Sequence, residues 1–532
     1  MRSDSVFRIA PRGGSSARAV IDAIDAMGGK AFDLSRMARL GLPVPPAFVL
    51  GTGHCRQWYL EPERYRKSLP ALLQEQMHWL QTVTGLGFGD SRRPLLVSVR
   101  SGAPLSMPGM MDTLLNIGLC DVTSRGLLRM TGNPRQVWDL YRRLVSSFAE
   151  VVFGADPAPF RAARDEMLAR NKVDRVRELD YQALFELAQG YLRLCEELTG
   201  RPFPQNPVNQ LELAVQAVFA SWNSARAAAY RSLYGIPDDI YTAATVQSMV
   251  FGNTGGTSGS GVGFTRDPDT GDKRLYFDFL FNSQGEDVVS GRATGSDAEE
   301  LFSALPEMRR ELCSVCDTLE AEFRDAQEFE FTIQDGALHL LQTRTAKRTP
   351  WAALKIAVDQ VKEGLISKEE ALVRLEGLDL TGIKRHRLAG EDTPFCIGES
   401  AGIGVAVGPA ALDLESARKF SEEGRPAVLI RDELNTADLV AISFCAGVLT
   451  ARGNRTSHAA VVARQLGKPC VTGAGGLRLD PGQQSVECGN RSISPGAMIT
   501  LDSNTGRVYE GERELIVEYP AQWLEEIGTW RR

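Results

Sequence analysis

The stretch FGNTGGTSGSGV, residues 251–262, lies between two runs with the character of strands, TVQSMV and GFTRD. It contains five glycines and four hydroxyl residues. Because glycine has no Cβ, such a loop can bring backbone N–H groups close to phosphate oxygens. It matches neither the P-loop nor the dinucleotide-binding pattern, since a strand follows it instead of a helix. Taken alone, it is equally well interpreted as the flexible tip of a hairpin.

A second hairpin follows at QEFEFTIQDGALHLLQTR, residues 327–344, which alternates polar and apolar residues around Asp335-Gly336. A three-residue loop with a left-handed glycine would place Glu328, Glu330 and Gln342 on one face. A two-residue turn would instead send Gln342 to the opposite face. Two carboxylates and an amide oxygen beside a phosphate loop suit Mg²⁺. The alternative is a set of polar residues on the solvated face of an antiparallel pair.

Two cations in the first hundred residues are candidate phosphate ligands. Lys30 lies in MGGKAFDLSRM, and Arg100 ends the strand LLVSVR. A lysine would act as a point charge and an arginine as a planar fork. Without further context, an ordinary surface cation is the preferred interpretation of each.

His458 stands in NRTSHAAVVARQLGKPCV, residues 454–471, where an alanine- and valine-rich helix is predicted to begin. Thr456 or Ser457 would cap this helix, and Gly467 would end it. A neutral imidazole is nucleophilic near pH 7, and the helix N-terminus stabilises an attached phosphate. A solvated or capping histidine is the alternative.

The composition predicts an ordinary globular protein. The chain has 532 residues, 43% hydrophobic and 24% charged, which predicts two to four domains. A net charge of −7 argues against a broad nucleic-acid or membrane surface. The N-terminus lacks the apolar core of a signal peptide, and nine scattered cysteines are typical of reduced thiols, so a cytoplasmic location is expected.

A helical connector follows the second hairpin. Thr349-Pro350 is a typical helix start, and Gly364 is a suitable end. Ser367 and Glu370 form the capping box of a second helix that ends near Gly377.

Four long stretches resemble the pyruvate, phosphate dikinase family: SVRSGAPLSMPGMMDTLLNIGL, VQSMVFGNTGGTSGSGVGFTRDPDTGDKRLYFDFLFNSQGEDVVSG, EFTIQDGALHLLQTRTAKRT and TSHAAVVARQLGKPCVTG. The resemblance covers about residues 20–510. It departs at GNRTSH, where the family usually has GGMTSH, so that Asn454 and Arg455 replace a small and an apolar residue. The family continues into a barrel that binds pyruvate and phosphoenolpyruvate, and this module is not expected before Arg532.

The resemblance implies a role for each matching residue. Lys30 and Arg100 correspond to ligands of the ATP phosphates, and Arg344 to a basic residue of the same site. Glu330 and Gln342 correspond to ligands of nucleotide and metal, with Mg²⁺ as the expected ion. Glu328 occupies a nucleotide-site position where the family commonly has aspartate. The loop 252–261 corresponds to the phosphate-covering loop, in which the expected contacts are Gly255, Gly256, Thr257, Ser258 and Gly259. His458 corresponds to the phosphorylated histidine.

The implied fold is an α/β and α+β multidomain protein. It has an ATP-grasp nucleotide-binding domain with a helical insertion, joined by a helical linker to a swivelling α/β phosphohistidine domain. The expected limits are 1–123 and 241–345 for the two ATP-grasp parts, 124–240 for the insertion, 346–390 for the linker, 391–511 for the phosphohistidine domain and 512–532 for the tail.

The implied function is that of an ATP-dependent dikinase. ATP, with inorganic phosphate, would phosphorylate His458 and give AMP and pyrophosphate. The phosphoryl group would then pass to pyruvate, or to another acceptor bound by a separate partner protein. Two alternatives are kept: a water dikinase or antibiotic phosphotransferase, and a phosphohistidine carrier or regulatory protein without metabolite turnover.

Overall fold

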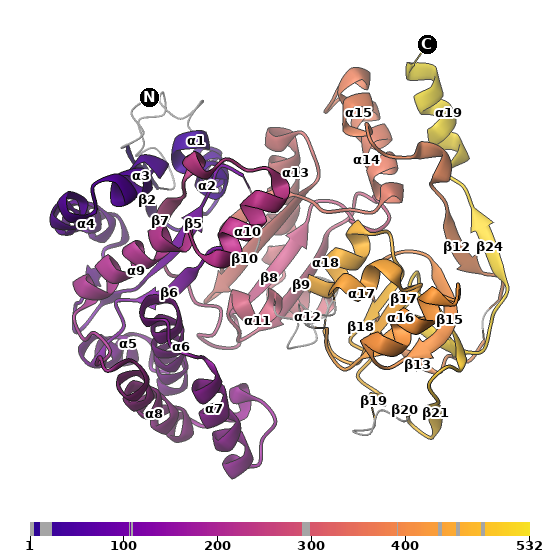
Figure 1. Ribbon diagram of the computed structural model, residues 1–532. Helices are drawn as coiled ribbons and strands as arrows, with labels where there is room; N and C mark the ends of the chain where they lie inside the picture. Colours follow the sequence, from indigo (N-terminus) through magenta and orange to yellow (C-terminus); the bar gives the residue numbers. More distant parts are fainter. Residues whose placement is uncertain are drawn as a thin grey trace. The chain divides into compact units, whose positions relative to one another are not determined.

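The computed structural model describes residues 5–10, 24–105, 107, 110–289, 298–390, 392–434, 439–453, 458–479 and 485–531. It confirms a mixed α/β protein with more than one compact part. Unit 1 comprises Met1–Thr254 and His339–Gln342, and unit 2 comprises Gly255–Leu338 and Thr343–Arg532. In the described part of the chain, no helix is long and apolar enough to cross a membrane. Figure 1 labels the elements.

Unit 1 is built on a five-stranded sheet in which every neighbouring pair is antiparallel. Central strand β7 is buried at every residue, because it packs between neighbours and under helices. The order across the sheet is β1 (Val6–Ile9), β2 (Ala47–Leu50), β7 (Ala243–Ser248), β5 (Val97–Gly102) and β6 (Thr113–Ile117). The short strands β3 (Gly87–Phe88) and β4 (Pro94–Leu95) pair separately.

The helices of unit 1 have clear local signals. In α6, for example, the side chain of Asn133 accepts a hydrogen bond from the Gln136 N–H, Pro134 occupies the first turn, and Gly154 ends the helix in the left-handed conformation. The helices are α1 (Ile24–Met27), α2 (Gly29–Arg39), α3 (Thr52–Leu60), α4 (Pro62–Thr84), α5 (Asp121–Thr131), α6 (Pro134–Phe153), α7 (Ala158–Asn171), α8 (Tyr181–Thr199), α9 (Pro207–Ser221) and α10 (Ala225–Tyr234).

Unit 2 begins with a four-stranded antiparallel sheet, in the order β11 (Ala337–Thr345), β10 (Gln327–Gln334), β8 (Gly259–Phe264) and β9 (Tyr276–Phe281). Its glycines have a packing role. A Cβ on Gly259 would lie 2.2 Å from Cζ of Phe279, and one on Gly261 would lie 2.4 Å from Cζ of Phe331. The aromatic rings therefore lie directly on the backbone of β8, where only glycine fits. Between β9 and β10 the chain forms three helices, α11 (Gly285–Val289), α12 (Ala298–Ala304) and α13 (Glu307–Phe323).

The two connector helices are present, with the caps that the sequence predicts. In α14 (Pro350–Lys362), Thr349 caps the first turn through the Ala352 N–H. In α15 (Lys368–Arg374), Ser367 and Glu370 form the reciprocal capping box. The left-handed glycines Gly364 and Gly377 follow the two helices.

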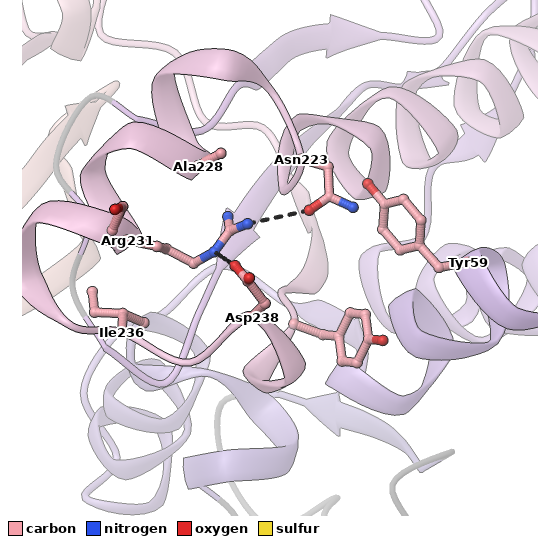
Figure 2. Close-up of a pocket in the computed structure, with 8 residues that line it drawn as sticks. Tyr59, Asn223, Ala228, Arg231, Ile236 and Asp238 are labelled. Carbon is pink, nitrogen blue, oxygen red and sulfur yellow. Dashed lines mark hydrogen bonds and ion pairs between the residues drawn. The ribbon is translucent and has the colours of Figure 1, made fainter.

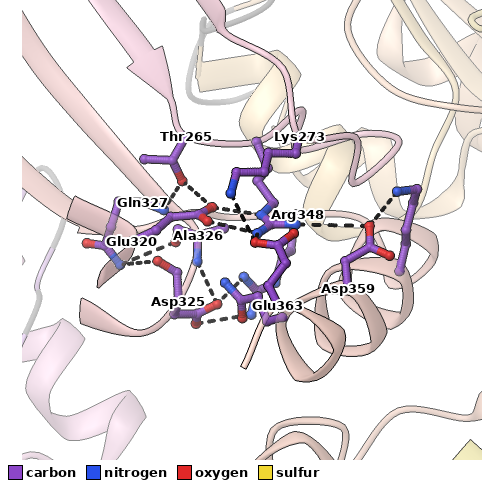
Figure 3. Close-up of polar contacts among 12 residues, drawn as sticks. Thr265, Lys273, Glu320, Asp325, Ala326, Gln327, Arg348, Asp359 and Glu363 are labelled. Carbon is purple, nitrogen blue, oxygen red and sulfur yellow. Dashed lines mark hydrogen bonds and ion pairs between the residues drawn. The ribbon is translucent and has the colours of Figure 1, made fainter. Parts of the chain in front are cut away.

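A buried ion-pair network fixes α14 to the four-stranded sheet (Figure 3). Arg266, two residues beyond the end of β8, donates to both oxygens of Glu320 at 2.8 Å and to Glu363 at 2.8 Å. The Arg266 side chain is completely buried and that of Glu320 is 4% exposed. Lys273 also binds Glu363. Arg266 therefore connects the segment after β8 to α13 and to the end of α14.

A two-stranded ribbon and a terminal helix complete the connector region. Strand β12 (Arg385–Leu388) pairs with β24 (Leu515–Glu518), and Arg385 also binds Glu518 at 2.8 Å. The final helix α19 (Ala521–Trp530) packs on α14, with the rings of Trp523 and Trp351 5.2 Å apart.

The rest of unit 2 is an eight-stranded sheet with a parallel centre, β15 to β18, and antiparallel edges. Its helices are α16 (Leu414–Glu422), α17 (Leu439–Phe444) and α18 (His458–Gln465). Its strands, in spatial order, are β13 (Cys396–Ile397), β23 (Arg507–Glu510), β22 (Met498–Asp502), β15 (Val405–Ala411), β16 (Val428–Arg431), β17 (Gly447–Thr450), β18 (Cys470–Thr472) and β14 (Glu399–Ser400). A small sheet of β19 (Leu477–Leu479), β20 (Val486–Cys488) and β21 (Arg491–Ile493) is attached in sequence. The predicted domain limits remain predictions.

Candidate functional site

In unit 1, the two predicted phosphate-binding cations lie on a helix and a strand whose backbones come into close contact at glycine residues. Lys30 is the second residue of α2, and Arg100 lies on β5, two residues before Gly102. A Cβ on Gly28 would lie only 1.8 Å from the carbonyl oxygen of Gly102, and the Gly29 N–H donates to Ala103. This close approach brings the first turn of α2 against the end of β5. Both predicted cations are therefore placed at the same end of this strand.

The same helix contains a partly buried carboxyl group, Asp33, one turn after Lys30. Burial raises the pKa of Asp33 to about 6, although the positive charge of Arg36 acts in the opposite direction. Because the folded state favours the protonated form, this group contributes stability below pH 4 that is lost as the pH rises through 6.

We therefore expect Asp33→Asn to be more stable than the wild type at pH 8 and equally stable near pH 3.5. A shift of this size corresponds to at most about 3 kcal/mol in the free energy of unfolding. Denaturant unfolding at a series of pH values measures the difference. Asp174→Asn, at an exposed aspartate of the same unit, is the control. A pH-independent difference for Asp33→Asn would show that the carboxyl does not titrate in this range.

In unit 2, the base of the glycine-rich loop is fixed to the turn of the β10–β11 hairpin. The Asp335 N–H donates to the Ser258 hydroxyl at 2.9 Å, and the Gly336 N–H donates to the Thr257 carbonyl at 3.1 Å. Gly256 is exposed, and a Cβ there would meet nothing within 4 Å. An open tip on a fixed base is the arrangement that a phosphate-covering loop requires. Gly259 differs, since it lies inside β8 beneath Phe279.

The hairpin has the two-residue turn. Strand β10 ends at Gln334 and β11 begins at Ala337, with Asp335 and Gly336 both at positive φ. A two-residue turn was expected to send Gln342 to the face opposite Glu328 and Glu330, and this expectation was wrong. Buried residues alternate through Leu338 and Leu340, but the next buried residue is Thr343, so the alternation shifts by one.

Because of this shift, Arg344 lies on the carboxylate face and binds Glu328. Strand alternation places Gln342 on the same side of β11 as Arg344.

The carboxylates of unit 2 lie on β10, where Glu328 pairs with Phe264 of β8 and Glu330 with Val262. The Glu328 side chain is 6% exposed and its Oε1 accepts from Arg344. Burial alone would lower the pKa of Arg344, but the charge and hydrogen bond of Glu328, with the charge of Glu330, raise it overall. These three groups therefore form one electrostatic cluster.

The donor set of this cluster fits Mg²⁺. The buried Oε2 of Glu328 has no hydrogen-bond partner among the described residues. A buried carboxylate oxygen without a partner is costly unless a cation or donor approaches it. Within the described ranges, no three His, Cys, Asp or Glu side chains gather into an all-protein cage. Mg²⁺ typically takes one or two carboxylates and completes its shell with phosphate and water, as Glu328, Glu330 and Gln342 would allow.

His458 is the first residue of α18, as predicted, and the left-handed Gly467 follows the end of the helix. The N-terminus of a helix is a favourable place for an anion, because its backbone N–H groups and the positive end of its dipole are directed there. The predicted caps Thr456 and Ser457, together with Asn454 and Arg455, lie outside the described residues.

A cavity of about 630 Å³ in unit 1 contains none of the predicted site residues (Figure 2). Its polar wall is Arg231, which donates to Asp238 at 2.8 Å, to Asn223 at 3.2 Å and to the Trp222 carbonyl. Every guanidinium nitrogen is thereby engaged within the protein. This arginine therefore holds together residues on both sides of α10.

Sequence reasoning did not single out Arg464, six residues after His458, or Asp269, in the β8–β9 connection. The structure joins them by hydrogen bonds of 2.7 and 3.3 Å. One signal was available, since Arg464 is the charged residue in the otherwise apolar helix HAAVVARQ.

Two family profiles match the chain. One is described as "Pyruvate phosphate dikinase, AMP/ATP-binding domain" and matches residues 64–299. The other is described as "PEP-utilising enzyme, mobile domain" and matches residues 424–506.

Curated relatives match along nearly the whole chain. "Pyruvate, phosphate dikinase" of Rhizobium meliloti (strain 1021) is 43% identical over 506 residues, 92% of this chain and 56% of the relative. The protein of the same name from Clostridium symbiosum is 40% identical over 515 residues, 95% of this chain and 58% of the relative. "Pyruvate, phosphate dikinase 2" of Zea mays is 41% identical, covering 95% and 57%. The chain therefore spans a little over half the length of these relatives.

Proposed function

Because the chain belongs to the pyruvate, phosphate dikinase family over the region shared with these relatives, we propose that it is an ATP-dependent dikinase phosphorylated on His458. The first half-reaction converts ATP, inorganic phosphate and the histidine to AMP, pyrophosphate and phosphohistidine. The second passes the phosphoryl group to pyruvate, the substrate for which the relatives are named. A separate polypeptide that supplies the acceptor site is a further element of the proposal.

The observation that carries the proposal is the cluster on β10. A buried carboxylate oxygen without a partner, beside Glu330 and Arg344, lies on the hairpin whose turn holds the glycine-rich loop. Carboxylates and a phosphate-binding loop on one supersecondary element are the parts that a Mg–nucleotide requires.

Each residue has a distinct role in the first half-reaction. Lys30 and Arg100 neutralise phosphate charge, the first as a point charge and the second as a fork. The open glycine tip lets backbone N–H groups approach the phosphates, and Arg344 supplies further positive charge. Glu330 and Gln342, with Glu328 adjacent, would hold Mg²⁺, which would supply neutralisation of the phosphate charge.

His458 acts as the phosphoryl carrier. Its neutral imidazole attacks the β-phosphorus of ATP, and AMP leaves as the α–β bridge breaks. Inorganic phosphate then takes the γ-phosphoryl group to form pyrophosphate, and the helix N-terminus stabilises the phosphohistidine that remains. Catalysis elsewhere is positioning and charge neutralisation.

The test is intact mass and nucleotide analysis of the wild type with Mg-ATP, with and without phosphate. The proposal predicts an acid-labile phosphoryl group, and AMP that accumulates only when phosphate is present. AMP formation that is independent of phosphate would indicate a water-dependent dikinase. If no phosphoryl group appears under either condition, the proposed function is wrong.

Glu330→Gln is expected to lower the initial rate of AMP formation about 100-fold, because a neutral amide holds Mg²⁺ less strongly than a carboxylate does. The Mg²⁺ concentration at half-maximal rate should rise in parallel. Glu311→Gln, at an exposed position of α13, is the control and should behave as the wild type. An unchanged Mg²⁺ dependence in Glu330→Gln would remove this residue from the metal site.

A further inference from the structure

A buried ion pair in unit 2 joins the regions matched by the two family profiles. Asp269 lies within residues 64–299, and Arg464 lies within residues 424–506. The Arg464 side chain is completely buried and that of Asp269 is 5% exposed. Their contact is a fork, with Nε to Oδ1 at 2.7 Å and Nη2 to Oδ2 at 3.3 Å.

Asp269 is held rigidly before it meets the arginine. Its N–H donates to the Asp267 carboxylate at 2.9 Å, and its carbonyl accepts from the Thr349 hydroxyl at 2.8 Å. Thr349 is the cap of α14, so the turn that contains Asp269 is held both by its own Asp267 and by the start of this helix. Because the backbone that bears the carboxylate is already fixed, less entropy is lost when Asp269 binds its partner.

Arg464 enters an environment of negative charge. Burial alone would lower its pKa, but the charges of Asp269 and Glu328 are among the causes that raise it overall. Glu328 is the carboxylate with the unpartnered buried oxygen on β10. The guanidinium also lies 5.9 Å from the centre of the Phe264 ring. The helix that begins with His458 is thus connected electrostatically to the carboxylate cluster.

The two sides of the pair have separate apolar cores. The core around α18 includes Ala460, Ala463 and Cys470, whereas the core beside Asp269 includes Phe264, Tyr276 and Ala352. A buried charge pair contributes little net stability, but it specifies geometry strictly, because either charge alone is costly to bury. Such a contact suits an association that has to form and separate repeatedly.

We propose that the Asp269–Arg464 pair is a latch that positions α18, and with it His458, on the nucleotide-binding part during the first half-reaction. This inference rests on the proposed function. Arg464 acts as a positioning residue, and the pair must open whenever the histidine serves an acceptor elsewhere. Loss of one partner leaves the other charge buried alone, so that the docked arrangement becomes unfavourable.

The test uses the full chain and two independent measurements. Small-angle scattering reports whether the parts separate, and rapid-quench single turnover with saturating Mg-ATP and phosphate reports transfer to His458. We expect Asp269→Asn and Arg464→Met to increase the radius of gyration and slow transfer by about 100-fold, with unchanged affinity for ATP. Arg464→Lys should recover part of the rate, because it retains the charge but loses the fork.

Asp272→Asn is the matched control, since it makes the same change in the same turn at a side chain that is 51% exposed. Unchanged scattering in Asp269→Asn overturns the latch, whatever the rate of transfer. A wild type that is never phosphorylated would contradict the proposed function, while the scattering comparison would still decide the latch. Retained ATP affinity shows that the variants are folded.

Discussion

Replacing His458 with alanine should eliminate the acid-labile phosphoryl group and reduce phosphate-dependent AMP formation by a factor on the order of 10⁴ or more. The imidazole is the nucleophile of the proposed first half-reaction, and alanine offers no atom that could take its place. The helix start and the nucleotide ligands remain, so ATP affinity should be unchanged.

The measurement is rapid-quench analysis of labelled ATP, with isothermal titration for affinity. His78→Ala is a suitable control, because His78 is exposed on α4 in unit 1. A phosphoryl group that survives in His458→Ala would place the acceptor at another residue and refute the phosphohistidine mechanism.

Arg266→Met should lower the free energy of unfolding by about 3–5 kcal/mol. The substitution keeps much of the side-chain volume but leaves the buried Glu320 carboxylate without its fork. Burial opposes the charge on Arg266, yet its bonds to Glu320 and Glu363 raise its pKa overall. The charge of Arg266 therefore balances the carboxylates of Glu320 and Glu363.

Denaturant unfolding followed by fluorescence measures this loss. Lys273→Met removes a cation from the same network, but its side chain is 49% exposed, so an effect below about 1 kcal/mol is expected. Equal losses in the two variants would show that burial of Arg266 does not determine its contribution.

Local sequence signals predicted local structure well. The caps Thr349 and Ser367 define the starts of α14 and α15, and the position of Gly467 agrees with the end of α18. Such signals are reliable because the hydrogen bonds involved join residues three or four positions apart. The mixed α/β character and the family followed from long matched stretches.

Features that depend on distant residues were not predictable. The turn at Asp335-Gly336 gave no indication that the alternation of buried residues along β11 shifts by one between Leu340 and Thr343. This shift decides the face on which Arg344 lies. The role of Gly259 depends on Phe279 of a neighbouring strand, and Arg266 binds a glutamate 54 residues away. Separations of this size leave no pattern in a single sequence.

The ribbon of β12 and β24 has an evolutionary consequence. Arg385 lies opposite Glu518, so the segment 389–514 leaves and rejoins the connector at strands about 4.8 Å apart. In architectural terms the eight-stranded sheet is a cassette inserted into an otherwise continuous polypeptide. Because its two ends meet, such a cassette can be excised, or grafted into an unrelated host, without stretching either chain. Recombination could therefore exchange the segment that contains His458 as a module.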